Sequence, residues 1–350
     1  MRNAPYHRAF TLRIMAFALL AAGVAAVSAS EPPATLWVAD AARLGSALLE
    51  IDVATGERSL IDLEDYPNVL TVSGGVQADD GTLFLGAVNA AQGVTIIRFD
   101  PAAGSVVGIS GFVDETSFEP RGTGPDFQPG LRGIVVGPWG RLYCLRRFGG
   151  PMSVDVATGD RLVISQSATP RVGDGVELRD PLDLVVEPRG TLLVADRFGN
   201  LVRVTPGSGR RTTAFEFVDL IEGPHRIERL PDGRVLHTFG AGDGRSISVF
   251  DLSLLSLSEL SGPGRGAGPE LAGLVDFVVA PDGSVYALDL ALRAVVAIDP
   301  ETGDRSLLAE DPEGADLGLL SGDARLVGFA VPNGPPSPRN AGGRVAAPGP

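Results

Sequence analysis

The sequence predicts an all-β fold, a six-bladed β-propeller closed by pairing the C-terminal strand with the N-terminal blade. Three observations support this prediction. A glycine turn between two apolar runs recurs five times, a second kind of turn recurs five times further along the units, and the two chain ends each supply part of a sixth unit. Such internal recurrence is the sequence signature of a repeat architecture.

The first recurring turn joins an apolar alternating run to a second strand, as in ADDGTLFLG and APDGSVYALD. Successive turn glycines are 59, 50, 43 and 50 residues apart, which fits a four-stranded blade with loops of variable length. The five glycines are Gly81, Gly140, Gly190, Gly233 and Gly283.

The second recurring turn has the pattern DVATGER or DPETGDR. Asp or Thr opens the turn, and Gly occupies the position that a tight hairpin needs at positive φ. The five copies are 52–58, 100–105, 155–161, 205–211 and 299–305.

The sixth blade is predicted to combine both ends of the chain. The first unit begins at TLWVAD (35–40) without an innermost strand, and the last apolar run, LVGFAV (326–331), has no unit of its own. Placing 326–331 beside 35–40 completes a blade and leaves the ring without a free end. A seventh blade would need about forty more residues than the chain has.

The two ends are predicted to lie outside the propeller domain, which spans 30–332. Residues 1–29 have a basic start, an apolar run over 14–27 and small residues before position 30, as a secretory signal peptide does. An uncleaved anchor is the alternative, although the apolar run is shorter than the roughly 20 residues of a spanning helix. Residues 333–350 are rich in Pro and Gly and are predicted to be a disordered tail. We therefore expect a periplasmic or secreted protein whose mature chain starts near Ser30.

Composition excludes several classes of function. The chain has 29 basic and 43 acidic residues and a net charge of −14; without the three Arg of the leader, 26 − 43 gives −17. Nucleic acid is a poor partner for a protein with this negative charge, because its phosphates are also negatively charged. No Lys occurs, which excludes Schiff-base chemistry and a phosphate-binding P-loop lysine, and the single cysteine, Cys144, excludes an internal disulfide. No membrane span is expected in the mature chain.

Aligning the first strands by their turns gives one residue per blade near the propeller axis. Three consecutive blades place Asp183, Arg226 and Asp276 there, and the other three place glycine. The inner strands start on the face that carries the loops between blades, so these side chains are expected to converge on one mouth of the central channel. Two interpretations stay open: a ligand-binding half-pocket, or an ion pair that only plugs the channel. The three glycines are Gly74, Gly133 and Gly328.

Few other residues suggest chemistry. His225 precedes Arg226 at the start of an inner strand and is the candidate acid or base, whereas His237 and Cys144 align with buried positions of sister blades. Three aspartates that end second strands are expected to bond turn backbone: Asp40, Asp196 and Asp289. The loop copies GTGPDF (122–127), GDGVEL (173–178) and GAGPEL (266–271) recur, which favours a structural role.

The repeat of apolar strand, PDG turn, LLVAD and DP-x-TG turn resembles the NHL repeat. It is also similar to the six-bladed propellers of the gluconolactonase and senescence-marker kind, over roughly 34–332. That resemblance implies a divalent metal near the axis, held by a Glu from an E-G-P segment, two Asn and an Asp. Here Glu222-Gly223-Pro224 lies in the fifth unit, and no axial Asn is present. If a metal such as Ca²⁺ binds, Glu222, Asp183 and Asp276 are its candidate ligands, with Arg226 competing for the same carboxylates.

The sequence thus favours an exported, non-catalytic propeller that binds a small polar ligand or a protein partner at the axial mouth. The alternative is a divalent-metal-dependent hydrolase or lyase, similar to the lactonases, that uses the same face.

Overall fold

The computed structural model describes most of the region predicted to be the propeller. The described residues are 35–40, 47–63, 69, 71–88, 93–112, 121–127, 130–146, 149–217, 224–239, 245–310 and 324–330. The predicted leader and the tail 333–350 lie outside them. Among the described residues, no helix is long and apolar enough to cross a membrane.

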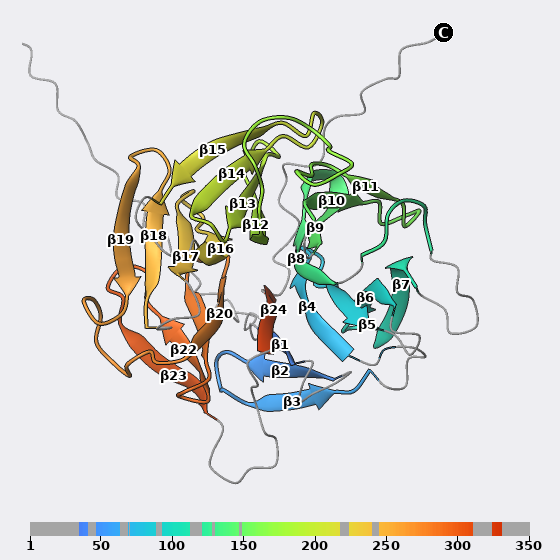
Figure 1. The fold of residues 1–350 in the computed structure, drawn as a ribbon. Helices are drawn as coiled ribbons and strands as arrows, with labels where there is room; N and C mark the ends of the chain where they lie inside the picture. Colours follow the sequence, from blue (N-terminus) through green and yellow to red (C-terminus); the bar gives the residue numbers. More distant parts are fainter. Residues whose placement is uncertain are drawn as a thin grey trace, which may run out of the picture. The chain divides into compact units, whose positions relative to one another are not determined.

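The described strands form six antiparallel four-stranded sheets, the predicted six blades, arranged around a common axis (Figure 1). Blade 1 contains β24 (Ala324–Ala330), β1 (Thr35–Asp40), β2 (Leu48–Asp52) and β3 (Arg58–Ile61). Blade 2 contains β4 (Thr71–Gln77), β5 (Leu83–Val88), β6 (Val94–Asp100) and β7 (Ser105–Gly111). Blade 3 contains β8 (Leu131–Val136), β9 (Leu142–Arg146), β10 (Pro151–Val154) and β11 (Arg161–Val163).

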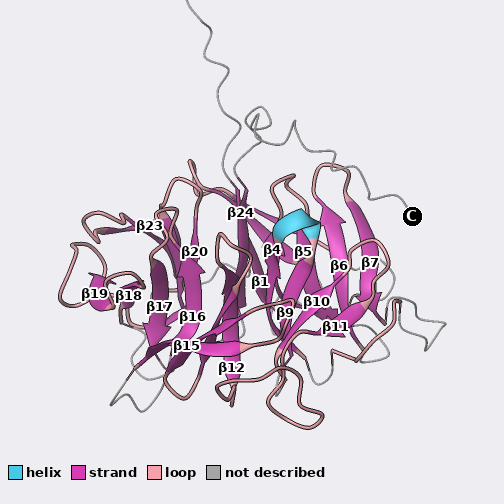
Figure 2. Cartoon of the chain, turned by 90° about the horizontal axis from the view of Figure 1, so that it is seen from above, coloured by secondary structure: helices cyan, strands magenta, loops and turns pink. Residues whose placement is uncertain are grey.

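The other three blades follow the same order from the axis outwards. Blade 4 contains β12 (Pro181–Val186), β13 (Leu192–Asp196), β14 (Asn200–Val204) and β15 (Arg211–Glu216). Blade 5 contains β16 (Pro224–Arg229), β17 (Val235–Phe239), β18 (Ile247–Asp251) and β19 (Ser256–Ser261). Blade 6 contains β20 (Leu274–Val279), β21 (Val285–Asp289), β22 (Ala294–Ile298) and β23 (Arg305–Glu310). One short 3₁₀ turn, η1 (Pro138–Gly140), follows β8 (Figure 2).

Blade 1 is assembled from both ends of the chain. Strand β24 pairs antiparallel with β1, with Thr35 opposite Ala330 and Trp37 opposite Gly328. This is the pairing that the sequence predicts, and it gives β1 a hydrogen-bonded neighbour on each side, because β2 pairs with its other edge.

The core lies between blades, because each sheet is apolar on both faces. In β1, Leu36 and Val38 pack against blade 6, while Trp37 and Ala39 pack against blade 2. Alternate residues of a strand point to opposite faces of its sheet. A blade buried on both faces therefore reads as a continuous apolar run, as LLVAD does in β13 (Leu192–Asp196).

The recurring turns have the predicted backbone. All five PDG-type glycines and the glycines of all five DP-x-TG-type turns have positive φ. In most of the latter turns the opening Asp also accepts backbone N–H bonds two and three residues ahead, as Asp299 does from Glu301 (2.7 Å) and Thr302 (3.1 Å).

A sixth copy of the DP-x-TG-type turn lies in blade 5. It is not recognisable from the sequence, because it lacks the turn glycine. Asp251 accepts bonds from the N–H groups of Ser253 (2.8 Å) and Leu254 (3.0 Å), as in the sister turns. The position of the turn glycine is occupied by Leu255, with φ of 52° and its side chain exposed. A leucine here is strained, because its Cβ crowds the backbone in the left-handed region.

We predict that Leu255→Gly stabilises the protein by up to about 1 kcal/mol, because relief of the left-handed strain exceeds the extra freedom of glycine in the unfolded chain. Chemical denaturation at 25 °C measures it. Leu257→Gly is the matched control: Leu257 is also exposed but lies within β19, where glycine weakens the strand. Equal destabilisation by both substitutions would contradict the strain argument.

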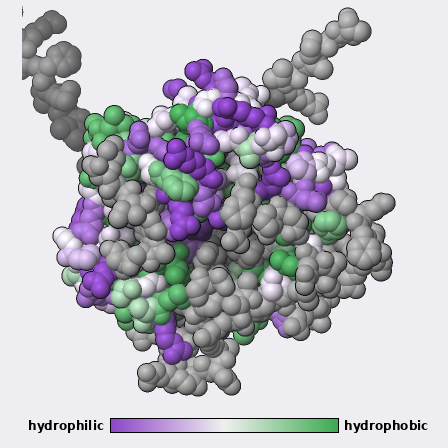
Figure 3. All heavy atoms as spheres, in the orientation of Figure 1, coloured by the Kyte–Doolittle hydropathy of each residue, from purple (hydrophilic) through white to green (hydrophobic). Residues whose placement is uncertain are grey.

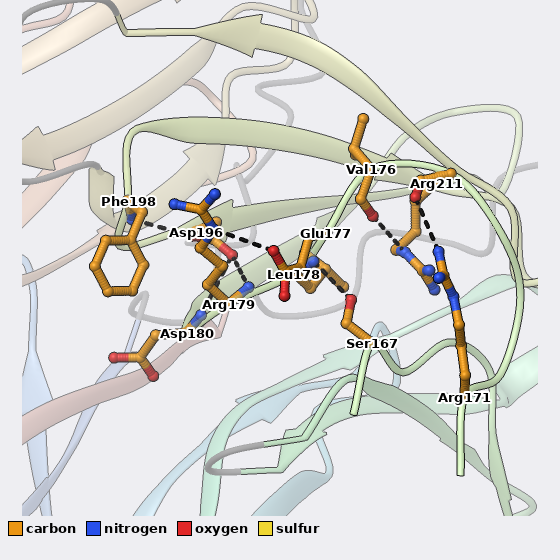
Figure 4. A network of polar contacts seen from close by, with 11 residues as sticks. Ser167, Arg171, Val176, Glu177, Leu178, Arg179, Asp180, Asp196, Phe198 and Arg211 are labelled. Atoms are coloured by element: carbon orange, nitrogen blue, oxygen red, sulfur yellow. Dashed lines mark hydrogen bonds and ion pairs between the residues drawn. The ribbon is translucent and has the colours of Figure 1, made fainter. Parts of the chain in front are cut away.

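Three arginines join neighbouring blades at the ring's periphery; Arg161 and Arg211 are buried, and Arg305 is partly buried. Each begins an outer strand and donates to backbone carbonyls of the loop that precedes its blade. Arg161 bonds the carbonyls of Arg121 (2.7 Å) and Pro125 (2.8 Å). Arg305 bonds that of Pro269 (2.6 Å). Arg211 bonds that of Val176 (2.6 Å), as Figure 4 shows.

These bonds explain the three recurring loops. The copies 122–127, 173–178 and 266–271 fold against the outer turn of the next blade, and a Cβ at Gly122 would lie 2.0 Å from the carbonyl oxygen of Gly159. The same joint includes a serine that donates to the facing turn, such as Ser165 Oγ to the Gly209 carbonyl (2.7 Å). The recurrence is therefore an inter-blade clamp.

We predict that Arg211→Ala destabilises the protein by about 2–4 kcal/mol, because it orphans buried carbonyl groups that accept charge-assisted bonds. Arg210→Ala is the control, since Arg210 is the exposed neighbour and its removal should cost less than about 0.5 kcal/mol. Denaturant unfolding of both variants measures the difference. Similar losses in the two variants would show that the clamp adds no stability.

Candidate functional site

The six inner strands share one irregularity at the axis. Each pairs with its neighbour through a register shift near its start, and in β16 the shift lies between Pro224 and Arg226. The shift leaves His225 as the extra residue of β16, beside Arg226 and partly buried. The same shift precedes Gly74, Gly133, Asp183 and Asp276 in their strands. A bulge re-aims the following side chain, which explains why equivalent residues meet at the axis.

The structure brings the three charged axial residues together. Arg226 donates to Asp276 through Nε to Oδ1 (2.5 Å) and Nη2 to Oδ2 (2.8 Å), a two-pronged bond. Its Nη1 lies 3.5 Å from Oδ2 of Asp183. Arg226 thus bridges blades 4 and 6 from the blade between them.

The two aspartates are also held by backbone amides. Asp183 accepts from the N–H of Leu184 (2.9 Å) and, across the joint, from that of Ile227 (3.0 Å). Asp276 accepts from the N–H of Phe277 (2.9 Å), the bond equivalent to that of Leu184. A Cβ at Gly133 would lie 2.9 Å from Oδ1 of Asp183, so glycine lets this carboxylate lean against blade 3.

Exposure differs within the cluster. The side chain of Asp276 is fully buried, that of Asp183 is 9% exposed and that of Arg226 is 21% exposed. Burial raises the pKa of Asp183, although Arg226 and the Ile227 amide oppose the shift. Burial disfavours the charge on Arg226, but the two carboxylates outweigh it and raise the pKa of the guanidinium.

Glu228 is a fourth member of the cluster that the sequence analysis did not single out. It lies two residues after Arg226, on the same side of β16, where the sister strands have Val185 and Val278. Burial, followed by the negative charge of Asp183, raises the pKa of Glu228 to about 8. The raised pKa favours the protonated form of Glu228 at neutral pH. The other three members of the cluster, two carboxylates and one guanidinium, sum to a charge of −1.

The remaining sequence-predicted residues fall in different places. Asp196 and Asp289 are buried and bond the backbone of the loops beside them, Asp196 to the N–H groups of Arg179 and Phe198 (Figure 4). Their sequence-based structural interpretation fits this geometry. His237 and Cys144 are buried in the core, where burial lowers the pKa of His237 to about 4 and raises that of Cys144 to about 12.

The predicted metal ligands do not fit a metal as they stand. The guanidinium of Arg226 lies between Asp183 and Asp276 and occupies the oxygens that a cation would use. Glu222 lies outside the described residues, as does the side chain of Asp40. Within the described part of the chain, no group of three or more His, Cys, Asp or Glu residues is placed to hold a metal ion.

The space-filling view shows one face of the ring, where hydrophilic residues border a hollow near the centre (Figure 3). Polar groups at the axis contrast with the apolar cores between blades.

Comparisons with known proteins show the fold. The chain matches no family model, and no curated protein matches it. Among solved structures, a chain of the nidogen–laminin complex aligns with a TM-score of 0.58 at 13% identity, over 85% of this chain and 97% of that one. The chain is a six-bladed β-propeller.

Two further solved structures share the propeller. A protein of unknown function from Bacteroides caccae aligns with a TM-score of 0.55 at 14% identity, over 85% of this chain and 98% of that one. A streptogramin B lyase aligns with a TM-score of 0.51 at 13% identity, over 78% of each chain. Sequence identities this low support a shared fold only. The activity has to be argued from the residues of the site.

We predict that the protein loses stability as the pH rises from 7 to 8, and that Glu228→Gln removes most of this loss. The folded state keeps the Glu228 proton up to about pH 8, whereas the unfolded chain releases it near the ordinary value of 4.5. The stability from this proton is therefore complete below pH 4.5 and declines as the pH rises towards 8, by at most about 1.4 kcal/mol per unit.

Denaturant unfolding at pH 7.0, 7.5 and 8.0 measures the slope. The window lies above the titration of His237 and below that of Cys144 in both states. Glu187→Gln is the control, because Glu187 pairs with Arg203 at the other end of an inner strand. Parallel slopes for the original protein and Glu228→Gln would disprove the assignment.

Proposed function

We propose that this chain is a non-catalytic binding propeller whose axial mouth takes a polar ligand that donates hydrogen bonds. The observation that carries the proposal is the cluster of Asp183, Arg226 and Asp276 at equivalent positions of three consecutive blades. The other three blades have glycine at this position, so the propeller does not need charge there.

The chemistry of the cluster favours a cationic or hydrogen-bond-donating group. Arg226 is already engaged by both oxygens of Asp276, so an incoming carboxylate would displace an internal one. Asp183 is less neutralised, because its closest approach to the guanidinium is 3.5 Å. With a summed charge of −1, these three residues suit an ammonium group presented to Asp183.

The solved structures do not choose between binding and catalysis. One is part of a protein–protein complex and another is a lyase, on the same architecture. Arg226 pairs with the carboxylates of both Asp183 and Asp276. A metal-dependent enzyme would need those carboxylate oxygens as ligands, so this pairing supports a binding function instead. We also propose export, which the leader-like residues 1–29 support.

We predict that the full-length chain binds glycylglycinamide, a probe with an ammonium group and no carboxylate, and that Asp183→Asn weakens the binding at least about tenfold through loss of a charge-assisted bond. Titration calorimetry measures both. Glu187→Gln is the control, because Glu187 belongs to the same blade and lies at the opposite end of β12.

The plug interpretation predicts a different pattern. An ion pair that only fills the channel leaves the probe unbound, and Arg226→Ala then costs roughly 3–5 kcal/mol by orphaning buried carboxylates. A ligand-binding cluster, reached by solvent through the exposed part of Arg226, loses less than about 2 kcal/mol. Failure to bind the probe together with the larger loss would overturn the proposal.

A further inference from the structure

Three leucines of the β18–β19 hairpin in blade 5 are exposed to solvent. Leu254, Leu255 and Leu257 are 74%, 61% and 46% exposed, and together they are called the leucine knob below. They lie in a run of six exposed residues, 253–258, that contains no charged side chain. Single exposed leucines are ordinary, whereas a contiguous apolar patch marks a surface that meets a partner.

The repeat does not require these leucines. The other five copies of the turn have threonine, alanine or serine at the position of Leu254 and glycine at the position of Leu255. Leu255 has φ of 52°, where its Cβ crowds the backbone. Blade 5 therefore keeps a strained, exposed leucine at a position where its sister blades have glycine. Strain of this kind persists where a residue serves a function.

The leucine knob adjoins a strand edge. β19 is the outermost strand of blade 5 and lies at the periphery of the ring, and none of the described strands pairs with its outer side (Figure 1). Such an edge presents backbone N–H and C=O groups that can pair with a strand of another chain. The first three residues of β19, Ser256 to Ser258, are exposed and uncharged.

This part of the surface lies away from the axial mouth. β16 begins at the mouth, and each later strand of the blade runs antiparallel to the one before it. The β18–β19 turn is therefore on the opposite face, so a partner bound there leaves the mouth open. The inference that follows does not depend on the proposed function.

The charge of this edge favours contact between two copies of the chain. A contact about a two-fold axis places one patch against itself, so every charge in it would meet a like charge. In four of the described turns an exposed charged residue follows the turn glycine, whereas blade 5 has Ser256 there. Blade 2 also has serine, but the fully described β7 exposes one large hydrophobic residue, Val107, at 39%. The four charged residues are Glu57, Asp160, Arg210 and Asp304.

We infer that the leucine knob and the outer edge of β19 form the contact of a weak homodimer. Each copy contributes the same three leucines, whose burial against one another removes apolar surface from water. The two β19 edges supply each other with strand partners. A lipid surface would cover the leucines but leave the backbone groups of the edge without hydrogen-bond partners.

Sedimentation equilibrium of the full-length chain tests the contact. Three leucines per copy cover far less than the roughly 800 Å² per partner of a stable interface, so we expect a dissociation constant on the order of 100 µM. The test variant combines Leu254→Thr with Leu255→Gly, which gives blade 5 the turn residues of its sister blades and suits the backbone. Its dimer should be weaker by at least about tenfold, because two apolar anchors are lost.

Leu162→Thr is the matched control. Leu162 is 63% exposed on β11, the outer strand of blade 3, and its replacement should leave the dissociation constant unchanged. Hydrogen exchange locates the contact: amides of 254–258 should gain protection between about 1 µM and about 1 mM protein, and those of 158–162 should not. The double variant should lose this gain and keep its monomer stability.

Three results would overturn the inference. The first is a monomer at every concentration up to about 1 mM. The second is association of equal strength in the double variant, which would place the contact elsewhere on the chain. The third is a monomer that sediments with phosphatidylcholine vesicles while the double variant does not, which would make a lipid surface the partner of the leucine knob.

Discussion

The whole architecture depends on closing the ring. A blade of this chain is apolar on both faces, so it is buried only when a neighbour covers each side. The first and last blades of an open row would each expose one such face to water. Pairing β24 with β1 couples the chain ends, and blade 1 can then cover blades 6 and 2 at once. Closure also fixes the axis, and with it the place where the inner strands converge.

Closure requires that neighbouring blades meet at a fixed angle. Specific side chains hold this angle at the joints between blades. At three joints an arginine donates to the carbonyl groups of the preceding loop, while a serine donates to the facing turn. Loop carbonyls without strand partners would be costly between packed sheets, and one guanidinium satisfies several of them. These arginines therefore satisfy loop carbonyl groups that have no strand partner.

The repeat also explains which features could be read from sequence. Turn glycines have one backbone requirement, so their spacing predicted six blades, and the same alignment placed Asp183, Arg226 and Asp276 in one column. Blade 5 hid its second turn because Leu255 occupies a glycine position under strain. Glu228 was missed although its signal was simple: it follows Arg226 by two residues and so lies on the same side. The ion pairs of Asp180 with Arg132 and Arg197 could not be found, because they depend on the bulge and on packing between blades. The role of Glu222 stays a prediction.

Six copies of one blade provide an internal comparison for separating architecture from function. Asp196 and Asp289 recur with the same bonds, as do the clamp arginines, so these charges belong to the fold. Arg226 and Glu228 each occur once around the axis. The position of Arg226 has glycine in blades 1, 2 and 3 and aspartate in blades 4 and 6, and the position of Glu228 has alanine in blade 1 and valine in the other four blades. Buried ion pairs seldom add stability over apolar residues of similar size, because removing charge from water offsets the attraction. The ring closes half of its axis with glycine, so the architecture does not require the ionisable groups in the other half, and this supports the proposed recognition of a polar ligand.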